Sequence, residues 1–221
     1  MRLSGNATRR DESKAPPVAG LVLAGGRGRR MGGRHKAFLE LGGETLVARV
    51  ARRLRRQVRH VAISANERQD ELRAFGEVVL EDTIPGFAGP LAGVLAGLEW
   101  LRGAHPDIAW LLTVAVDTPF FPHDLARRLL LAAQKANAEV ALAADERRRH
   151  PVFALWHVGL ADDLRRALVQ ENVRKVALFL SWRRAVDVVF PSTKGGMEPF
   201  FNINTADDLR SAVEYAQNEI G

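Results

Sequence analysis

The chain has 221 residues, of which 47% are hydrophobic, and a formal net charge of +6 at pH 7. Its length suits one substantial core, and it contains no apolar run of the roughly 18 residues that a membrane span requires. The absence of cysteine excludes disulfides, thiolate metal sites and thiol nucleophiles, and fits a reducing cytoplasm. The basic balance favours anionic partners, among them nucleotides and nucleic acids.

Residues 1–17 are polar and lack the apolar centre of a secretory signal. The pair Pro16-Pro17 marks the point where the folded part is expected to begin. We therefore expect a disordered leader over 1–17 and a single domain over 18–221.

A glycine-rich basic loop follows the first predicted strand. The apolar run over 18–23 predicts a buried parallel strand, and Ala24, Gly25 and Gly26 leave the backbone accessible where it ends. Backbone N–H groups at such a strand end can bind phosphate oxygens. Up to five cations then follow, interleaved with glycine: Arg27, Arg29, Arg30, Arg34 and Lys36. This pattern predicts a polyphosphate site, with a mobile basic loop as the open alternative.

Two standard nucleotide motifs are excluded for this loop. A dinucleotide fingerprint starting at Gly26 requires glycine at position 31, which is Met31. A Walker A loop requires Ser or Thr after its Gly-Lys pair, whereas Lys36 is followed by Ala37.

Strands and helices alternate through the next segments. A Gly42-Gly43 turn precedes a helix that Thr45 caps, and a strand over 60–65, a helical segment over 67–75 and a strand over 78–80 follow. This order is typical of a doubly wound parallel sheet. The first helix carries five arginines off its apolar stripe, which we interpret as a solvated face rather than a nucleic-acid surface: Arg49, Arg52, Arg53, Arg55 and Arg56.

Polar residues follow several of the predicted strands. Gly89 and Pro90 open a helix that extends through Leu101, and the most apolar strand, over 108–116, ends at Asp117. A carboxylate in that position can hold a divalent cation, although it can also cap the turn that follows. We expect the strand ends to meet at one edge of the sheet: Leu23, Asn66, Asp82 and Asp117.

The second half carries weaker signals. A strand over 140–144, a hairpin tip over 145–149 and a strand over 152–156 precede two helical segments and a possible edge strand over 186–190. We interpret His150 as a turn residue, and none of the six histidines has the sequence spacing of a metal site.

The segment Pro199–Thr205 places two amides on one face if it is extended, namely Asn202 and Asn204. Two such amides suit recognition of a flat heterocycle, or they can tie loop backbone. Thr205 and Asp208 fit a capping box for the final helix.

These motifs together resemble the molybdenum cofactor guanylyltransferases. They lie in order along nearly the whole chain, at residues 23–36, 81–82, 89–93, 117–119, 150–151 and 202–205. The resemblance implies a three-layer α/β fold with a Rossmann-like, mostly parallel sheet of the nucleotidyltransferase type. It also implies a nucleotide-binding half at about 18–120 and an acceptor-binding half at about 121–221.

The implied reaction transfers GMP from GTP to the terminal phosphate of molybdopterin and releases pyrophosphate. The implied cofactor is Mg²⁺ and the implied location is the cytoplasm. The implied partners are cofactor-insertion and molybdoenzyme-maturation proteins, with no membrane and no specific nucleic acid.

The resemblance also assigns roles by position. Catalysis would depend on Lys36, Arg30 and Asp117, with Asp117 as the magnesium ligand, and the acceptor side on Asn202 and Asn204. The nucleotide side would consist of Leu23, Ala24, Gly25, Gly26, Lys36, Ser64, Asn66, Asp82 and Asp117. Ser64 is a departure, because some relatives have asparagine there.

Two alternatives remain from the sequence. A cytidylyltransferase acting on the same cofactor, or on another small phosphate ester, would share the fold and metal chemistry; its relatives more often resemble Ala-Ala-Gly where this chain has Gly25-Gly26. An arginine-rich nucleic-acid-binding protein is the alternative from another class, and it gives Asp82 and Asp117 no role.

Overall fold

The computed structural model describes residues 16–25, 35–84, 86, 89–192 and 197–218. Most of the leader and of the basic loop, including Gly26 and Arg30, lies outside the described residues. Among the described helices, none has both the length and the apolar character to cross a bilayer.

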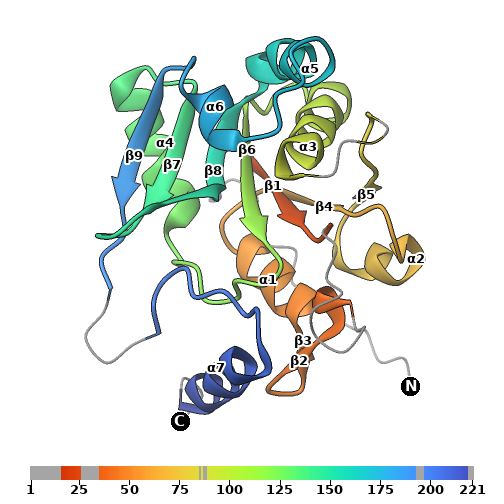
Figure 1. Ribbon diagram of the computed structural model, residues 1–221, viewed down its shortest axis with the longest axis vertical. Coiled ribbons are helices and arrows are strands. Elements are labelled where there is room, and N and C mark those ends of the chain that lie inside the picture. The colour runs from red at the N-terminus through yellow and green to blue at the C-terminus, as the bar shows by residue number, and fades with distance from the viewer. Residues whose placement is uncertain (1–15, 26–34, 85, 87–88, 193–196, 219–221) are drawn as a thin grey trace, which may run out of the picture.

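A seven-stranded sheet in the order β5-β4-β1-β6-β8-β7-β9 forms the centre of the fold (Figure 1). All of its strands run parallel except β8, which is antiparallel to both neighbours. This arrangement confirms the predicted α/β fold with a mostly parallel sheet. The strand bounds are β1 Val18–Leu23, β4 His60–Ser64, β5 Val79–Leu80, β6 Trp110–Ala115, β7 Val140–Ala144, β8 Arg149–His157 and β9 Ala185–Val189.

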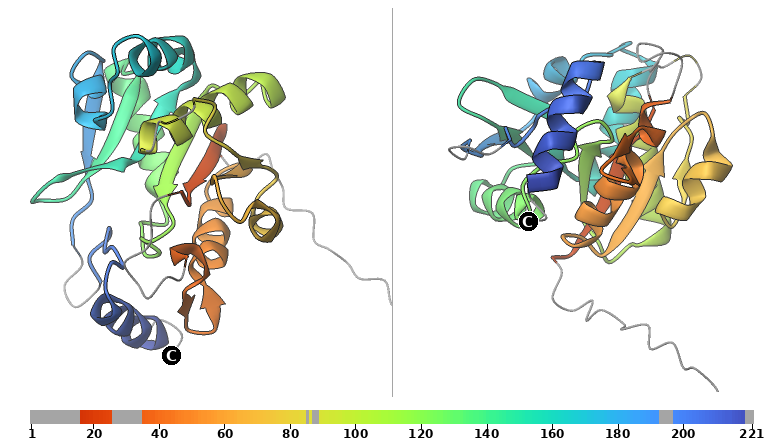
Figure 2. Two further views of the ribbon diagram at one scale, coloured as in Figure 1. Left: turned by 45° about the vertical axis from the view of Figure 1, so that its right-hand side comes forward. Right: turned by 90° about the horizontal axis from the view of Figure 1, so that it is seen from below.

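Helices cover both faces of the sheet, which gives the three predicted layers (Figures 1 and 2). One face packs against α1 (Leu46–Arg55) and α4 (Leu125–Ala136). The other packs against α3 (Pro90–Ala104), α5 (Ala161–Val169) and α6 (Val176–Leu180). All six residues of β1 are buried, as the apolar run over 18–23 predicts for a strand that is covered on both faces. The short α2 (Gln69–Leu72) and a 3₁₀ turn, Arg73–Phe75, connect β4 to β5.

A small hairpin and the last helix form a separate hydrophobic cluster beside the sheet. β2 (Glu40–Leu41) pairs with β3 (Glu44–Thr45), and α7 (Ala206–Asn218) packs next to them (Figure 1). Gly42 and Gly43 have φ values of +62° and +81°, as a two-residue hairpin turn with two left-handed positions requires. The turn is therefore confirmed, whereas strands of two residues each are too short to give a periodic signal.

The expectation of a solvated arginine face on α1 is wrong in part. The guanidinium of Arg49 is buried over the Phe120 ring, 5.1 Å from its centroid. Arg53 donates hydrogen bonds to the carbonyl oxygens of Phe121 and, at 3.3 Å, Phe120. These contacts arise because the segment after Asp117 folds back over the helix, so they anchor that segment and leave less basic surface for a nucleic acid. The other three arginines are exposed, namely Arg52, Arg55 and Arg56.

The first turn of α3 lies very close to the sheet because Gly93 has no side chain. A Cβ at this position would lie 2.6 Å from Ser64 Oγ and 2.8 Å from Leu23 Cδ2. The glycine therefore lets α3 begin directly against the carboxyl ends of β1 and β4. Gly89 is the N-cap of the helix and Pro90 its first residue, as predicted.

Gly93→Val should lower the free energy of unfolding by about 1–3 kcal/mol, because overpacking here must move α3 or the strand ends. Gly103→Val is the matched control in the same helix, since a Cβ at Gly103 would meet nothing within 4 Å. That control should change the free energy by less than about 0.5 kcal/mol. Urea titration of both variants measures the difference. Equal losses of unfolding free energy would contradict the close contact between α3 and the strand ends.

Candidate active site

The carboxyl ends of β1, β4 and β6 form the floor of the candidate site. The backbone N–H of Ala24 donates to the carbonyl of Ser64 at 2.9 Å, and that of Val116 donates to Leu23 at 3.2 Å. The chain moves from β1 to β4 on one side and returns to β6 on the other, so this edge is a topological switch point, where open α/β sheets bind ligands. The predicted convergence of the strand ends is confirmed.

Lys36 joins the two halves of the site. It begins the 3₁₀ turn Lys36–Phe38, and its Nζ donates to Asp117 Oδ2 at 2.8 Å and to Asn204 Oδ1 at 2.6 Å. The Lys36 and Asp117 side chains are each 18% exposed, so the ion pair is partly shielded from water but accessible to a ligand. Three segments that are distant in sequence therefore meet at one ammonium group.

Backbone contacts fix the position of Asn204. The N–H of Ile203 donates to the carbonyl of Asp117 at 2.8 Å, and Ile203 is buried while Asn202 and Asn204 are exposed. Exposure over 202–204 follows the predicted alternation, whereas Pro199 and Phe200 lie in a turn and not in an extended segment. The structure places Asn204 against Lys36, whereas Asn202 lies exposed nearby in sequence.

The predicted capping box of the last helix is also confirmed. Asp208 donates its N–H to Thr205 Oγ1 at 3.1 Å, and its carboxylate accepts the N–H groups of Thr205 and Asn204 at 2.8 and 2.9 Å. The hydrogen bond from Asn204, with those from Thr205, lowers the pKa of Asp208 below its ordinary value. The cap therefore holds the Asn204 backbone in place beside Lys36.

Asn66 and Asp82 form two reciprocal hydrogen bonds after the ends of β4 and β5. Asn66 Nδ2 donates to Asp82 Oδ2 at 2.8 Å, and Asp82 N–H donates to Asn66 Oδ1 at 2.9 Å. Burial raises the pKa of Asp82, and the hydrogen bond from Asn66 opposes that rise. The two residues fix one another at the edge where a nucleotide base is expected.

The other residues that were predicted to bind the nucleotide also lie near this edge of the sheet, and they differ in how exposed they are. Leu23 and Ala24 are buried, and the Leu23 carbonyl and the Ala24 N–H are bonded within the sheet, whereas Gly25 is exposed. Ser64 is buried beneath Gly93, so its hydroxyl lies under the first turn of α3. This position gives Ser64 a role in seating the helix.

Sequence reasoning missed a second polar pair, Asp145 and His150. The interpretation of His150 as a turn residue is wrong, because it is a buried residue of β8; its Nε2 lies 2.7 Å from Asp145 Oδ2 at the carboxyl end of β7. Its ring stacks on Phe200 with centroids 4.4 Å apart. The pair therefore supports the segment that continues to Asn202 and Asn204. The adjoining His150-Pro151 was the available signal, but its partner could not be read from the sequence.

Asp145 should make the stability of the protein depend on pH. Burial raises the pKa of Asp145, but hydrogen bonds from His150 and from the N–H groups of Arg147 and Arg148 outweigh burial and lower it to about 2. Because the folded pKa is depressed, the stabilisation is present above the unfolded value and is lost as the pH falls towards 2. At neutral pH the parent should therefore have a higher urea midpoint of unfolding than Asp145→Asn. The difference between the two midpoints should become smaller between about pH 5 and 2.5. A difference in urea midpoint that does not change with pH would contradict this account.

Asp117 offers a suitable ligand for a hard divalent cation. Its Oδ2 is engaged by Lys36, while Oδ1 has only a long 3.5 Å contact, from the Thr118 hydroxyl, within the described residues. Mg²⁺ prefers carboxylate and phosphate oxygens and retains several waters, so this carboxylate oxygen is of the kind that Mg²⁺ binds.

A mostly parallel sheet with a switch point, where Lys36 pairs with Asp117, is an α/β arrangement suited to binding a nucleotide. A family model described as "MobA-like NTP transferase domain" matches residues 20–186. The chain belongs to this family of MobA-like NTP transferases.

Curated relatives and solved structures agree with this membership. The chain is 44% identical over 207 residues to the molybdenum cofactor guanylyltransferase of Bradyrhizobium sp. (strain ORS 278), covering 94% of this chain and 97% of that protein. It is 46% identical over 200 residues to the protein of the same name from Rhizobium meliloti (strain 1021), covering 89% and 90%. Among structures, molybdopterin-guanine dinucleotide biosynthesis protein A from Archaeoglobus fulgidus is similar, with a TM-score of 0.71, 25% identity, and coverage of 90% and 99%.

Proposed function

We propose that this protein is a molybdenum cofactor guanylyltransferase, which transfers GMP from GTP to the terminal phosphate of molybdopterin and releases pyrophosphate. The observation that carries the proposal is the contact of Lys36 with Asp117 and Asn204 at the switch point. This contact connects the strand ends of the proposed nucleotide-binding half to the segment around Asn204 in the proposed acceptor-binding half. The names of the curated relatives support the same activity.

In the proposed reaction, a phosphate oxygen of molybdopterin attacks the α-phosphorus of GTP. A new P–O bond forms as the bond to the bridging oxygen of the leaving pyrophosphate breaks. Such a transfer depends mainly on in-line positioning and on neutralising negative charge. The Lys36 ammonium group has three N–H donors. Two of them donate hydrogen bonds to Asp117 and Asn204, so the third can donate one to a phosphate oxygen.

The other residues divide between the two substrates. Asn66 and Asp82 hold the guanine side, and the backbone of Leu23, Ala24 and Gly25 approaches the nucleotide. On the acceptor side, Asn202 faces the pterin, while Asn204 orients Lys36. Gly26 and Arg30 lie outside the described residues, and we propose that both contribute to phosphate binding.

Asp117 would hold Mg²⁺ through its accessible carboxylate oxygen. When bound, the ion supplies positive charge that stabilises the phosphates and the leaving pyrophosphate. We further propose that the reaction takes place in the cytoplasm and that its product passes to cofactor-insertion and molybdoenzyme-maturation proteins.

Pyrophosphate release tests the proposed reaction. Purified protein should release pyrophosphate from GTP only when both molybdopterin and Mg²⁺ are present. Release that needs no molybdopterin would indicate hydrolysis, and release that requires a different phosphate ester would contradict the proposed acceptor.

A further inference from the structure

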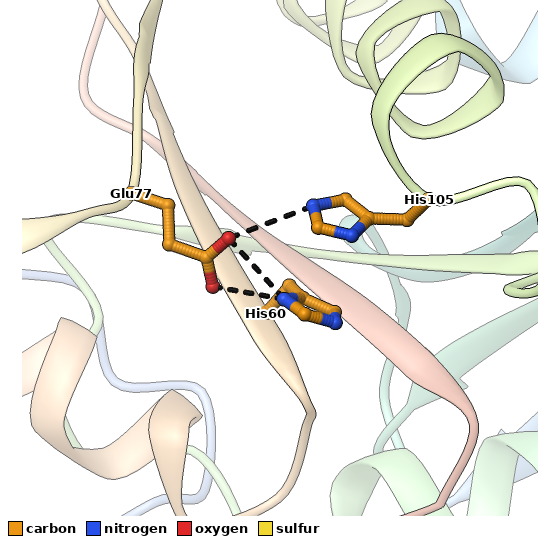
Figure 3. Close-up of side chains that lie close together, drawn as sticks. All are labelled: His60, Glu77 and His105. Atoms are coloured by element: carbon orange, nitrogen blue, oxygen red, sulfur yellow. Dashed lines mark hydrogen bonds and ion pairs between the residues drawn. The ribbon is translucent and has the colours of Figure 1, made fainter.

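A second cluster of reactive side chains lies at the other edge of the sheet. His60 is the first residue of β4, Glu77 precedes β5, and His105 ends α3. Within the described part of the chain, one ligand atom from each of the three lies within 4.8 Å of the others. Figure 3 shows the two imidazoles and the carboxylate turned toward one another.

The distances within the cluster suit a small metal ion. His60 Nδ1 lies 3.1 and 3.2 Å from the two Glu77 oxygens, and His105 Nε2 lies 3.5 Å from Glu77 Oε2. Tetrahedral ligands at about 2.0–2.2 Å from Zn²⁺ are themselves separated by about 3.3–3.5 Å. The imidazole rings of His60 and His105 are stacked with centroids 3.8 Å apart, so an ion could replace the present hydrogen-bond contacts once the rings turn to direct one nitrogen each at it.

The backbone holds the glutamate of this cluster in place. Glu77 N–H donates to the Val61 carbonyl at 2.8 Å, and Glu77 Oε1 accepts the Val61 N–H at 3.3 Å. Such outer contacts orient metal ligands. The carboxylate is thus directed toward the histidines by the edge of β4.

Ring packing and backbone bonds hold the second histidine. The N–H of His105 donates to the Leu101 carbonyl at 2.9 Å, and its ring lies edge-on to Trp100 and stacked on His60. The side chains of His60, Glu77 and His105 are 28%, 46% and 18% exposed, so an ion can reach them from solvent.

We propose that His60, Glu77 and His105 bind one divalent late first-row transition-metal ion, such as Zn²⁺, with water completing its coordination. Two imidazoles and one carboxylate favour such an ion, whereas Mg²⁺ prefers oxygen ligands. The site is therefore distinct in chemistry from Asp117.

This metal site has a structural role. β4 extends over five residues from His60 to Ser64, so the cluster lies about 13 Å from the substrate edge at a rise of about 3.3 Å per residue. The ion cross-links β4, the segment before β5 and the end of α3, and the opposite ends of these elements carry Asn66, Asp82 and Gly93. It therefore braces the nucleotide-binding half without touching substrate.

Metal titration of the untagged full-length protein tests the site. Zn²⁺ calorimetry and the visible absorption of Co²⁺ should both give one ion per chain. His60→Asn, His105→Asn and Glu77→Gln should each weaken binding by at least about 100-fold, since changes to outer partners alone cost 10–100-fold. Zn²⁺ should also raise the thermal midpoint of the parent and not that of these variants.

Two matched controls separate this site from others. His157→Asn removes a histidine outside the cluster, and Asp117→Asn removes the proposed magnesium ligand; both variants should keep the Zn²⁺ affinity of the parent. If a histidine variant unfolds, Glu77→Gln still tests the site, because the amide retains an oxygen for the Val61 N–H. The proposal is overturned if the parent binds no ion, or if the cluster variants bind Zn²⁺ as the parent does.

Discussion

Lys36→Ala is expected to reduce the rate of GMP transfer by at least about 100-fold, the scale of losing one preorganised group that stabilises developing charge. The ammonium contacts both Asp117 and Asn204, so its removal takes away a phosphate donor and the link between the two halves of the site. Steady-state rates of pyrophosphate release with GTP and molybdopterin measure the loss.

The fold should survive the Lys36→Ala substitution. Each side chain of the ion pair is 18% exposed, so its loss leaves a mostly buried carboxylate without its donor and should lower the free energy of unfolding by about 1–3 kcal/mol, which a folded domain can lose. Lys135→Ala, on the exposed surface of α4, is the matched control and should retain the parental rate. A Lys36→Ala rate within twofold of the parent would remove Lys36 from the mechanism.

Asp117→Asn is expected to lower the rate by at least about 100-fold as well. Asparagine keeps the size of the side chain and an oxygen that can accept the Lys36 hydrogen bond, so the substitution isolates the negative charge. Without that charge, the affinity for Mg²⁺ should fall, and the Mg²⁺ concentration for half-maximal rate should rise.

The control for Asp117 is Asp107→Asn, which changes an exposed carboxylate in the turn before β6. It should leave both the rate and the Mg²⁺ dependence unchanged. If Asp117→Asn kept the parental Mg²⁺ dependence, another group would have to hold the cation.

Local patterns were sufficient to predict much of the fold. The apolar run over 18–23 gives β1 with its observed bounds, because a strand buried on both faces is continuously hydrophobic. Thr45 caps α1 as predicted, with the Ala48 N–H donating to its hydroxyl at 3.4 Å. The position of Asp117 at the end of β6 followed from the same reasoning.

Contacts between distant segments could not be predicted in this way. The burial of Arg49 depends on Phe120, which folds back onto α1 from beyond β6. The histidine cluster could not be predicted from spacing along the sequence, because His60 and His105 meet only through the packing of α3 on the sheet. Hydrophobic periodicity predicts which face of a helix or strand is buried, but the element that packs on that face depends on the topology of the fold.

Asn204 shows the same limit within the site. Alternation predicted that Asn202 and Asn204 share a face, and both are exposed on either side of the buried Ile203. The contact of Asn204 with Lys36 could not be predicted, because it depends on the bond between Ile203 N–H and the Asp117 carbonyl.

The most direct test of the proposed function identifies the nucleotide that the protein attaches to the cofactor. Purified protein is incubated with Mg²⁺, molybdenum-loaded molybdopterin and either GTP or CTP, and the mononucleotide released by mild hydrolysis of the product is analysed. The account predicts GMP from the GTP reaction and no nucleotide from the CTP reaction. CMP from the CTP reaction, or no nucleotide from either, would contradict the proposed guanylyl transfer.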